Sequence, residues 1–357
     1  MNASLGPLVG HALQINMHPL DVDHVVETLP HQLRAWRGQV DRVVITLDHK
    51  VSTTGRYHAA DYNEKLARLT GLLERLSGSD AAIHVDLVDY SSEAIEGVRK
   101  AFFSAEPSLP LKAFDGGPFY AYFYGLYRAN AERVLHMDSD MLFGGMSQRW
   151  MAEADAVFDA RPDALFVCPF SGPPRADGTI DESLHVGFPG RRAFVPPQWL
   201  GLDVPAYGFN AVSTRIFVLD MRRFVERIGS LPLVRPDFKR RLRAHLLDQS
   251  PLTMPAEEVL SASMERLGLE RVDLLGGAPG MFSLHPPYRN PAFYRQLPEL
   301  IRRTESSDLP DGQLGDFDVN ASMIDWSDAL AAKSRPARLK KALRQLIAAN
   351  RARLLGQ

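Results

Sequence analysis

The sequence predicts an α/β fold, because short apolar runs alternate with segments of helical periodicity along most of the 357 residues. Apolar runs at 11–17, 42–47, 83–88 and 134–137 each have an Asn or Asp at or next to their carboxyl end, a pattern that indicates buried parallel strands. The composition agrees, since 45% of residues are hydrophobic and 24% are charged. We therefore expect a mixed, mainly parallel sheet with helices on both faces.

Charge and cysteine content narrow the functional classes. The formal net charge is -2, so the overall charge does not favour a nucleic-acid partner. The single cysteine, Cys168, lies in an apolar run, where we expect it to be buried and unable to form a disulfide within the chain. No basic segment followed by an apolar one opens the chain, and no apolar run has the length of a membrane span. We therefore expect a cytoplasmic protein.

The first half of the chain places polar residues at successive strand ends. Helices are expected between the strands, at about 20–36, 62–76 and 92–103. Strands that alternate with helices form parallel units, so their carboxyl ends share one edge of the sheet. Asn16, Asp48 and Asp89 are therefore candidate ligand contacts, with helix capping or a loop position as the alternative for each.

The stretch Arg133–Phe143 carries two carboxylates between apolar runs. Asp138 and Asp140 are one residue apart at the expected end of a buried strand, where ligands gather in open α/β sheets. Two like charges in an apolar setting are unfavourable unless a cation joins them, and a hard divalent cation holding a diphosphate would do so. The alternative is a polar turn in which Asp138 or Ser139 caps a helix.

Asp-Ser-Asp after an apolar strand resembles the DxD site of GT-A glycosyltransferases. The resemblance implies that Asp138 contacts the ribose or a metal, and that Asp140 coordinates Mn2+ or Mg2+ bound to a nucleotide diphosphate sugar. It also implies that Asn16, Asp48 and Asp89 contact the base and ribose. The first strand is followed neither by Gly-x-Gly-x-x-Gly, which disfavours a classical dinucleotide fold, nor by a Gly-rich Arg loop, which disfavours a sugar-nucleotide pyrophosphorylase.

The same resemblance divides the chain. It implies a GT-A domain over 1–300, in which about 10–140 binds the nucleotide and 141–300 forms the acceptor and catalytic half. The remaining 301–357 would form a mobile loop and a helical extension, since 305–320 is polar and acidic. A basic amphipathic helix at 335–357 would dock on the domain or, alternatively, contact an anionic membrane face.

Gly116–Pro118 predicts the start of an aromatic-rich helix that runs to about Ala131. Most of its rings are expected to pack in the core, although one ring near a uracil-like base would be able to stack on it. Phe114, Asp115 and Gly117 at the entrance are better ligand candidates, because backbone amides there are able to face a phosphate.

Two later segments resemble donor and catalytic motifs of the family. Tyr207–Ala211 is similar to the Phe-Asn-Ala strand beside the donor sugar, so Asn210 is a candidate for a sugar hydroxyl contact or else a satisfied loop residue. The helix expected from Pro255 resembles the acidic helix of inverting enzymes. Inverting transfer needs a general base, for which Glu258 is favoured and Glu257 is close behind. The alternative is ordinary acidic residues in a first helical turn.

The segment Met281–Arg289 resembles the C-terminal segment that returns a third metal ligand. His285 matches that ligand, and neutral imidazole with two carboxylates suits Mn2+. Tyr288 and Arg289 would clamp the diphosphate. The Pro- and Gly-rich stretch 171–206 is expected to shape the acceptor site through His185 and Trp199, with a core position as the alternative for the Trp.

The predicted function is transfer of a sugar from a nucleotide diphosphate sugar, with a UDP-sugar favoured, to an acceptor hydroxyl. The acceptor would be a sugar, a lipid-linked molecule or a small molecule. Inversion with Glu258 as the base is favoured, and a retaining enzyme with the same metal site is the alternative. A nucleotidyltransferase and a non-catalytic sugar- or lipid-binding protein remain as alternatives from other classes. No Gln-x-x-Arg-Trp motif is present, which disfavours a processive polysaccharide synthase.

Overall fold

The computed structural model describes residues 8, 10–51, 61–180, 198–246 and 250–332. Its strands are β1 (His11–Met17), β2 (Arg42–Leu47), β3 (Ile83–Leu87), β4 (Arg133–Asp138), β5 (Leu142–Gly144), β6 (Ala164–Ser171), β7 (Gln198–Trp199), β8 (Ala206–Phe209), β9 (Ile216–Asp220), β10 (Glu270–Leu274) and β11 (Phe282–Leu284). Its α-helices are α1 (Val22–Trp36), α2 (Tyr62–Ser79), α3 (Ser92–Phe102), α4 (Tyr120–Ala129), α5 (Trp150–Ala160), α7 (Met221–Arg223), α8 (Phe238–Leu246), α9 (Ala256–Leu267), α10 (Pro291–Glu305) and α11 (Ser327–Ala332). Short turns of 3-10 or π-helix cover Pro19–Asp21, Arg37–Gln39, Phe224–Ile228 and Asp311–Gln313.

The central sheet has the order β3-β2-β1-β4-β9-β6-β10-β8-β7, with β5 and β11 attached beside β6. Strands β1 to β4 are parallel, and β9 and β8 run against their neighbours. The predicted mixed, mainly parallel α/β sheet is therefore confirmed. The chain moves outward from β1 to β2 and β3 and then returns to place β4 on the other side of β1, which creates the crevice where such sheets bind ligands.

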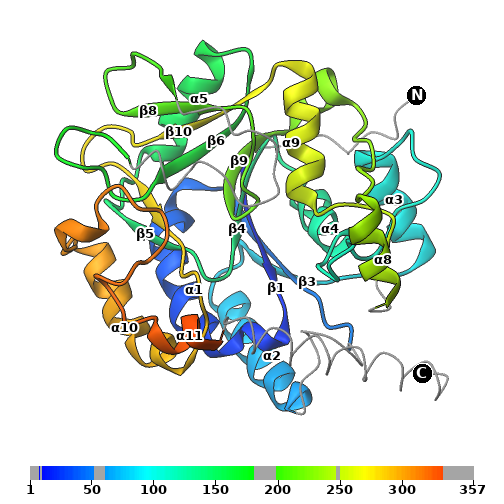
Figure 1. Ribbon diagram of the computed structural model, residues 1–357, viewed down its shortest axis with the longest axis horizontal. Coiled ribbons are helices and arrows are strands. Elements are labelled where there is room, and N and C mark those ends of the chain that lie inside the picture. Colours follow the sequence, from blue (N-terminus) through cyan, green and yellow to red (C-terminus); the bar gives the residue numbers. More distant parts are fainter. Residues whose placement is uncertain (1–7, 9, 52–60, 181–197, 247–249, 333–357) are drawn as a thin grey trace.

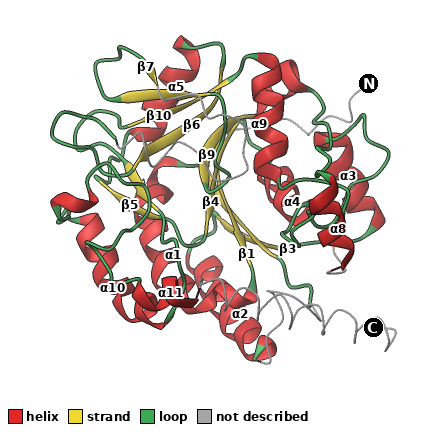
Figure 2. Ribbon diagram, viewed as in Figure 1, coloured by secondary structure: helices red, strands yellow, loops and turns green. Residues whose placement is uncertain are grey.

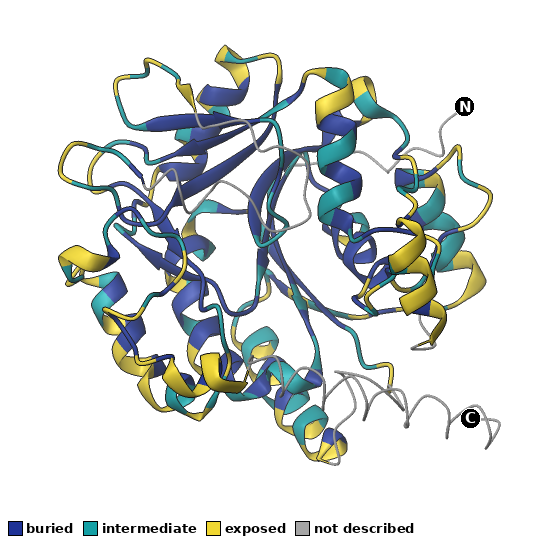
Figure 3. Ribbon diagram, in the orientation of Figure 1, coloured by how far each residue is buried: buried dark blue, intermediate teal, exposed yellow. Residues whose placement is uncertain are grey.

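Helices cover both faces of the sheet (Figures 1 and 2). On one face, α1, α2 and α5 pack on alternate residues of β1, β4 and β6, including Leu13, Leu135 and Val167. On the other face, α3, α4 and α9 pack on the intervening positions, and Cys168 is buried there as expected. Period-two alternation thus divides each strand between two apolar layers, and dark blue strands between the helices mark this core in Figure 3.

A third apolar cluster joins the C-terminal elements to the sheet. Phe293 of α10, Trp326 just before α11 and Ala329 of α11 lie in one apolar cluster with β11. Helix α10 runs to Glu305, so it crosses the boundary expected at residue 300. The segment expected to be a mobile loop is held by hydrogen bonds, since the buried Gln313 amide donates to the carbonyls of Asp316 and Asp318 at 3.0 Å each. The polar composition of the segment did not indicate this order, because its hydrogen-bond partners are largely backbone groups of the same segment.

Two expectations fall on residues outside the described ones: His185 and the helix at 335–357. Among the helices that are described, none is long and apolar enough to cross a lipid bilayer.

Candidate active site

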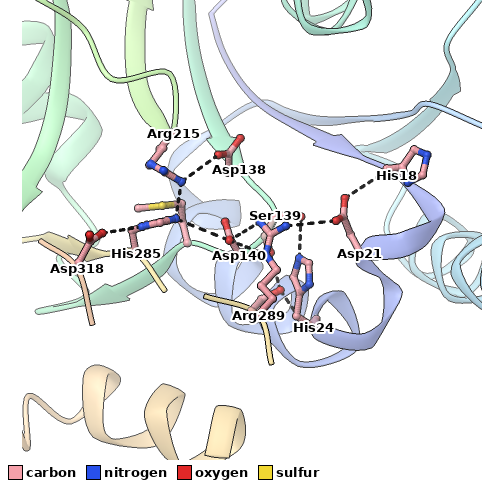
Figure 4. A network of polar contacts seen from close by, with 12 residues as sticks. His18, Asp21, His24, Asp138, Ser139, Asp140, Arg215, His285, Arg289 and Asp318 are labelled. Atoms are coloured by element: carbon pink, nitrogen blue, oxygen red, sulfur yellow. Dashed lines mark hydrogen bonds and ion pairs between the residues drawn. The ribbon is translucent and has the colours of Figure 1, made fainter. Parts of the chain in front are cut away.

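The Asp138–Asp140 turn lies at the crevice between β1 and β4. Asn16 is the register partner of Asp138, and the Asp138 amide donates to the Arg215 carbonyl at 2.7 Å, where β9 begins. Figure 4 shows side chains from separate parts of the chain, among them His24, Arg215 and His285, gathered around this turn. The topology therefore brings distant parts of the sequence to one point, as the strand-end pattern predicted.

Helix α1 holds the turn from below through a row of buried polar residues. His24 contacts the Ser139 hydroxyl at 3.0 Å, and the Thr28 hydroxyl donates to the Ser139 carbonyl at 2.6 Å. The Gln32 amide donates to the carbonyls of Asp138 and Met141 at 3.1 Å each. These three side chains, spaced four residues apart, are fully buried. We call them the α1 clamp, because they satisfy the backbone of the turn and fix its orientation.

Sequence reasoning used the apolar residues of this helix and did not identify the clamp. The available signal was the spacing of His24, Thr28 and Gln32, which places three polar side chains on one face of an otherwise amphipathic helix. Buried polar residues need partners, so such a face indicates contact with irregular backbone.

The two carboxylates of the turn have different electrostatic environments. Burial and the nearby charge of Asp140 raise the pKa of Asp138, although its side chain keeps 39% exposure to water. Asp140 is 1% exposed, and burial alone would raise its pKa as well. The surrounding positive charge, to which Arg289 contributes most, outweighs that effect and lowers the pKa of Asp140 below its usual range. Asp140 is therefore the permanently charged member of the pair.

Two guanidinium groups balance these carboxylates. Arg289 Nε donates to Asp140 Oδ2 at 2.9 Å, and Arg289 Nη1 lies 3.7 Å from Asp21 Oδ1. Arg215 Nη1 lies 4.0 Å from Asp138 Oδ2 and also contacts His285 Nε2. The sequence analysis singled out Arg289 but not Arg215. The sequence around Arg215 did not indicate a site residue, because Arg215 was expected only to begin a strand.

His285 follows β11 and faces the same point. Its Nδ1 is 2.7 Å from Asp318 Oδ1, and its Nε2 is 4.0 Å from Asp140 Oδ2. These partners assign the ring proton to Nδ1, which donates to Asp318, and leave the lone pair of Nε2 facing Arg215 and Asp140. A carboxylate behind a histidine in this way orients the ring as a metal ligand.

Asp138, Asp140 and His285 are the residues that could bind a divalent cation here. In the described part of the chain, no three His, Cys, Asp or Glu side chains converge closely enough to hold a metal as they stand. The positively charged guanidinium of Arg215 lies between Asp138 and His285, where a metal cation would lie. Among the described residues, Asp140 Oδ1 is buried without a hydrogen-bond partner. Carboxylate oxygens with imidazole nitrogen suit Mn2+, so the residues fit a cation that replaces Arg215.

The acidic start of α9 is tied to the segment that carries Arg215. Glu257 Oε2 accepts from the Thr214 amide at 3.4 Å, and the Val212 amide donates to the Ser261 hydroxyl at 3.1 Å. Glu258 lies beside Glu257 in the first turn and is also half-buried. Glu257 thus contacts the segment that leads into Arg215.

Tyr122 of α4, one of the aromatic rings of which most were expected to pack in the core, adds a buried hydroxyl. Its ring lies 4.9 Å from the His136 ring, and its hydroxyl has no hydrogen-bond partner within the described residues. Burial, followed by the charges of Asp138 and Glu257, raises the pKa of Tyr122 well above its usual range. The hydroxyl therefore stays protonated and can donate to a ligand between these two carboxylates.

The candidates in the nucleotide half lie along the same sheet edge but differ in their contacts. Asn16 Oδ1 accepts from the Thr46 hydroxyl at 2.6 Å, and Asp48 Oδ1 accepts from the Tyr90 hydroxyl at 3.0 Å. Asp89 accepts from the Ser91 amide at 2.8 Å, which is the turn that precedes α3. For Asp89 this contact corresponds to the loop alternative, since the residue that caps α3 is Ser91.

The remaining candidates occupy turns and the C-terminal cluster. Asp115 Oδ1 accepts from the Gly117 amide at 2.9 Å, so these two predicted ligands bond to each other. Asn210 is half-buried directly after β8. The Tyr288 ring packs edge-on against Trp326, with ring centroids 5.3 Å apart. Trp199 is 50% exposed on β7, which rules out the core position considered as its alternative.

Comparisons with known proteins give structural likeness only. No protein-family model and no curated protein matches the sequence. Similar solved structures include GalNAc-T7 with UDP, GalNAc and Mn2+, at 12% identity and a TM-score of 0.40, covering 80% of this chain and 45% of that one. S. aureus TarS with UDP-GlcNAc has 12% identity and a TM-score of 0.39, covering 82% of this chain and 65% of that one.

A third similar structure is the mannosyltransferase PcManGT from Pyrobaculum calidifontis with GDP-Man and Mn2+, at 13% identity and a TM-score of 0.33, covering 99% of this chain and 89% of that one. This chain spans 45% and 65% of the lengths of the first two proteins. The conclusions about chemistry below rest on the residues of the site.

Proposed function

We propose that this protein is a metal-dependent glycosyltransferase that uses a nucleotide diphosphate sugar. The observation that carries the proposal is the convergence of Asp138, Asp140 and His285 with the guanidinium groups of Arg215 and Arg289 at the sheet crevice. Two carboxylates and an imidazole would supply ligands for a divalent cation, and two guanidinium groups beside them suit a diphosphate. Few ligands other than a metal-bound diphosphate require both charges at one point.

The residues have distinct roles in this proposal. Asp138, Asp140 and His285 would hold Mn2+ or Mg2+, which, when bound, neutralises charge on the leaving diphosphate. Arg215 and Arg289 would turn from the carboxylates to the diphosphate oxygens, since a guanidinium binds either group through paired N–H donors. The α1 clamp keeps the carboxylates oriented throughout, because its hydrogen bonds are to the turn and not to the ligand.

An acceptor hydroxyl needs a proton acceptor when the enzyme inverts. Both Glu257 and Glu258 lie at the start of α9, and the contact of Glu257 with Thr214 favours Glu257 over the initially preferred Glu258. Tyr122 would donate its hydroxyl hydrogen to the donor sugar or the diphosphate between Asp138 and Glu257. A retaining enzyme would use the same metal site without a base at α9.

The test is ligand-induced stabilisation of the full chain. UDP and GDP, with and without Mn2+, are added to the wild type and to Asp140→Asn, and the melting temperature is measured. Ligands that bind only the native state must raise it. We expect one diphosphate to stabilise the wild type only when metal is present, and the variant to lose that response.

The matched control is Asp163→Asn, which removes an exposed carboxylate elsewhere and should respond like the wild type. Product release from the corresponding nucleotide sugar is measured in parallel, with Glu257→Gln and Glu258→Gln compared. A wild type that responds to no diphosphate, or an Asp140→Asn protein that responds equally, would reject the proposed site.

A further inference from the structure

Helix α8 exposes a row of large apolar side chains. Phe238 is 70% exposed, and Leu242 and Leu246 are each 50% exposed. These residues are four positions apart, so they form one stripe along the helix. A lone exposed apolar residue is ordinary, but an ordered row of three on one helix marks a surface that contacts another phase or molecule.

The stripe points directly away from the protein. An α-helix turns by about 100° per residue, so the three residues share an arc of about 80°. Arg240 and Ala244 occupy the opposite side. Ala244 is fully buried, and the Arg240 guanidinium lies over the Phe114 ring at 5.6 Å. The helix is therefore anchored by one side, and Figure 3 colours most of α8 as exposed.

Cations border the stripe on both sides. By the same helical geometry, Lys239 and Arg243 lie on one flank, and Arg241 and His245 lie on the other. All four are exposed. Within the described ranges, no acidic partner is recorded for Lys239, Arg241 or Arg243, and α8 itself contains no Asp or Glu.

We propose that α8 is a docking helix that lies in the plane of an anionic lipid surface, with its apolar stripe inserted among the acyl chains. An apolar centre with basic residues on both flanks fits such a surface, because the long basic side chains reach outward to the headgroup phosphates while the rings and branched chains enter the apolar layer. A purely apolar protein groove would not complement the positive charge on both flanks. Leu252, shortly after α8 in the chain, is also 53% exposed.

The position of α8 connects this surface to the site. The segment after α8 leads into α9, and its Thr253 carbonyl accepts from the Phe114 amide at 3.0 Å. Docking through α8 would therefore hold the acidic start of α9 near the lipid surface. The proposal stands on the exposure and charge of α8 alone, so it does not depend on the transferase function.

The first test is binding of the full chain to vesicles, measured by co-sedimentation. Phosphatidylcholine vesicles containing phosphatidylglycerol are compared with phosphatidylcholine alone. We expect binding to the anionic vesicles, weakened at least tenfold by Leu242→Ser/Leu246→Ser and by Lys239→Gln/Arg241→Gln/Arg243→Gln. Controls remove similar exposed residues elsewhere, through Leu87→Ser/Leu330→Ser and Arg149→Gln/Arg222→Gln/Arg302→Gln.

A second measurement reports on α8 itself. Phe238→Trp should gain fluorescence that shifts to the blue on anionic vesicles and is quenched by brominated acyl chains, whereas Leu330→Trp should not. The proposal is overturned if the α8 variants bind anionic vesicles as tightly as the wild type, if the wild type does not prefer them to neutral vesicles, or if the Phe238→Trp signal is unchanged by lipid. Thermal melts confirm that each variant is folded.

Discussion

Helices α1 and α8 break the ordinary amphipathic rule in opposite ways. Helix α1 buries three polar residues at intervals of four, whereas α8 exposes three apolar residues at the same interval. In α1 each polar side chain finds a partner in the Asp138–Met141 turn: His24 contacts the Ser139 hydroxyl, and Thr28 and Gln32 donate to backbone carbonyls. In α8 the described part of the fold does not cover the stripe. Departures from local consistency thus coincide with the two surfaces for which we propose functions.

Removing the most connected residue of the α1 clamp should have the largest effect. Gln32→Leu leaves the Met141 carbonyl buried without its side-chain donor and leaves the Asp138 carbonyl with only the Met141 amide, at 3.3 Å. We expect the free energy of unfolding to fall by about 3 kcal/mol, since each unsatisfied buried group costs about 1–3 kcal/mol. Urea unfolding measures this. A loss below about 0.5 kcal/mol would mean that water replaces the amide and that the clamp is dispensable.

The contact of Glu305 on α10 with His31 and Arg34 on α1 should make the free energy of unfolding depend on pH in the acid range. The hydrogen bond from His31 and the neighbouring Arg34 lower the pKa of Glu305 to about 2. A lowered folded-state pKa gives stability that is present above the unfolded pKa near 4.5 and is lost as the pH falls toward 2. Each pKa unit corresponds to about 1.4 kcal/mol, and partial exposure reduces the total to about 2 kcal/mol.

Glu305→Gln tests this sign. The variant should be less stable than the wild type at pH 7 and should lose less stability between pH 5 and pH 2. Urea unfolding at several pH values gives both quantities, with Glu299→Gln as an exposed control on the same helix. Parallel pH curves for Glu305→Gln and wild type would contradict the assignment.

Substitution of Arg215, on the side of the Asp138–Asp140 turn away from the α1 clamp, is expected to raise the affinity for a metal ion. Arg215 contacts His285 and lies near Asp138, so it competes with a cation for both. Arg215→Gln should bind Mn2+ alone about tenfold more tightly, which corresponds to about 1.4 kcal/mol, while it binds the metal-dependent diphosphate less tightly. Calorimetric titration measures both. Arg227→Gln, an exposed ion-pair partner elsewhere, is the control, and unchanged Mn2+ affinity of Arg215→Gln would contradict the prediction.

The smallest effect on stability is expected at α8. Leu242→Ser removes an exposed side chain, so the free energy of unfolding should change by less than about 0.5 kcal/mol. Urea unfolding beside Thr28→Val, which removes a clamp hydroxyl and should cost about 1 kcal/mol, makes the comparison direct. A large loss in Leu242→Ser would mean that the stripe supports the fold and is not a docking surface.

The sequence by itself determined the parts that depend on local pattern. Alternating apolar runs and helical periodicity gave the mixed, mainly parallel sheet, and strand-end positions placed Asp138 and Asn16 at one edge. Periodicity is local, because each residue's face follows from its neighbours in the chain. His285 and Arg289 were found through the order of short motifs and lie beside Asp140, as expected.

Only the tertiary structure decided which side chains meet. The α1 clamp and Arg215 act on residues far away in the chain, and no local pattern encodes such a contact. The favoured carboxylate of α9 depends on the rotation of that helix about its axis, since adjacent residues point about 100° apart. Exposure of the α8 stripe likewise depends on what the rest of the fold covers. The sequence specifies the elements, and their packing specifies the partners.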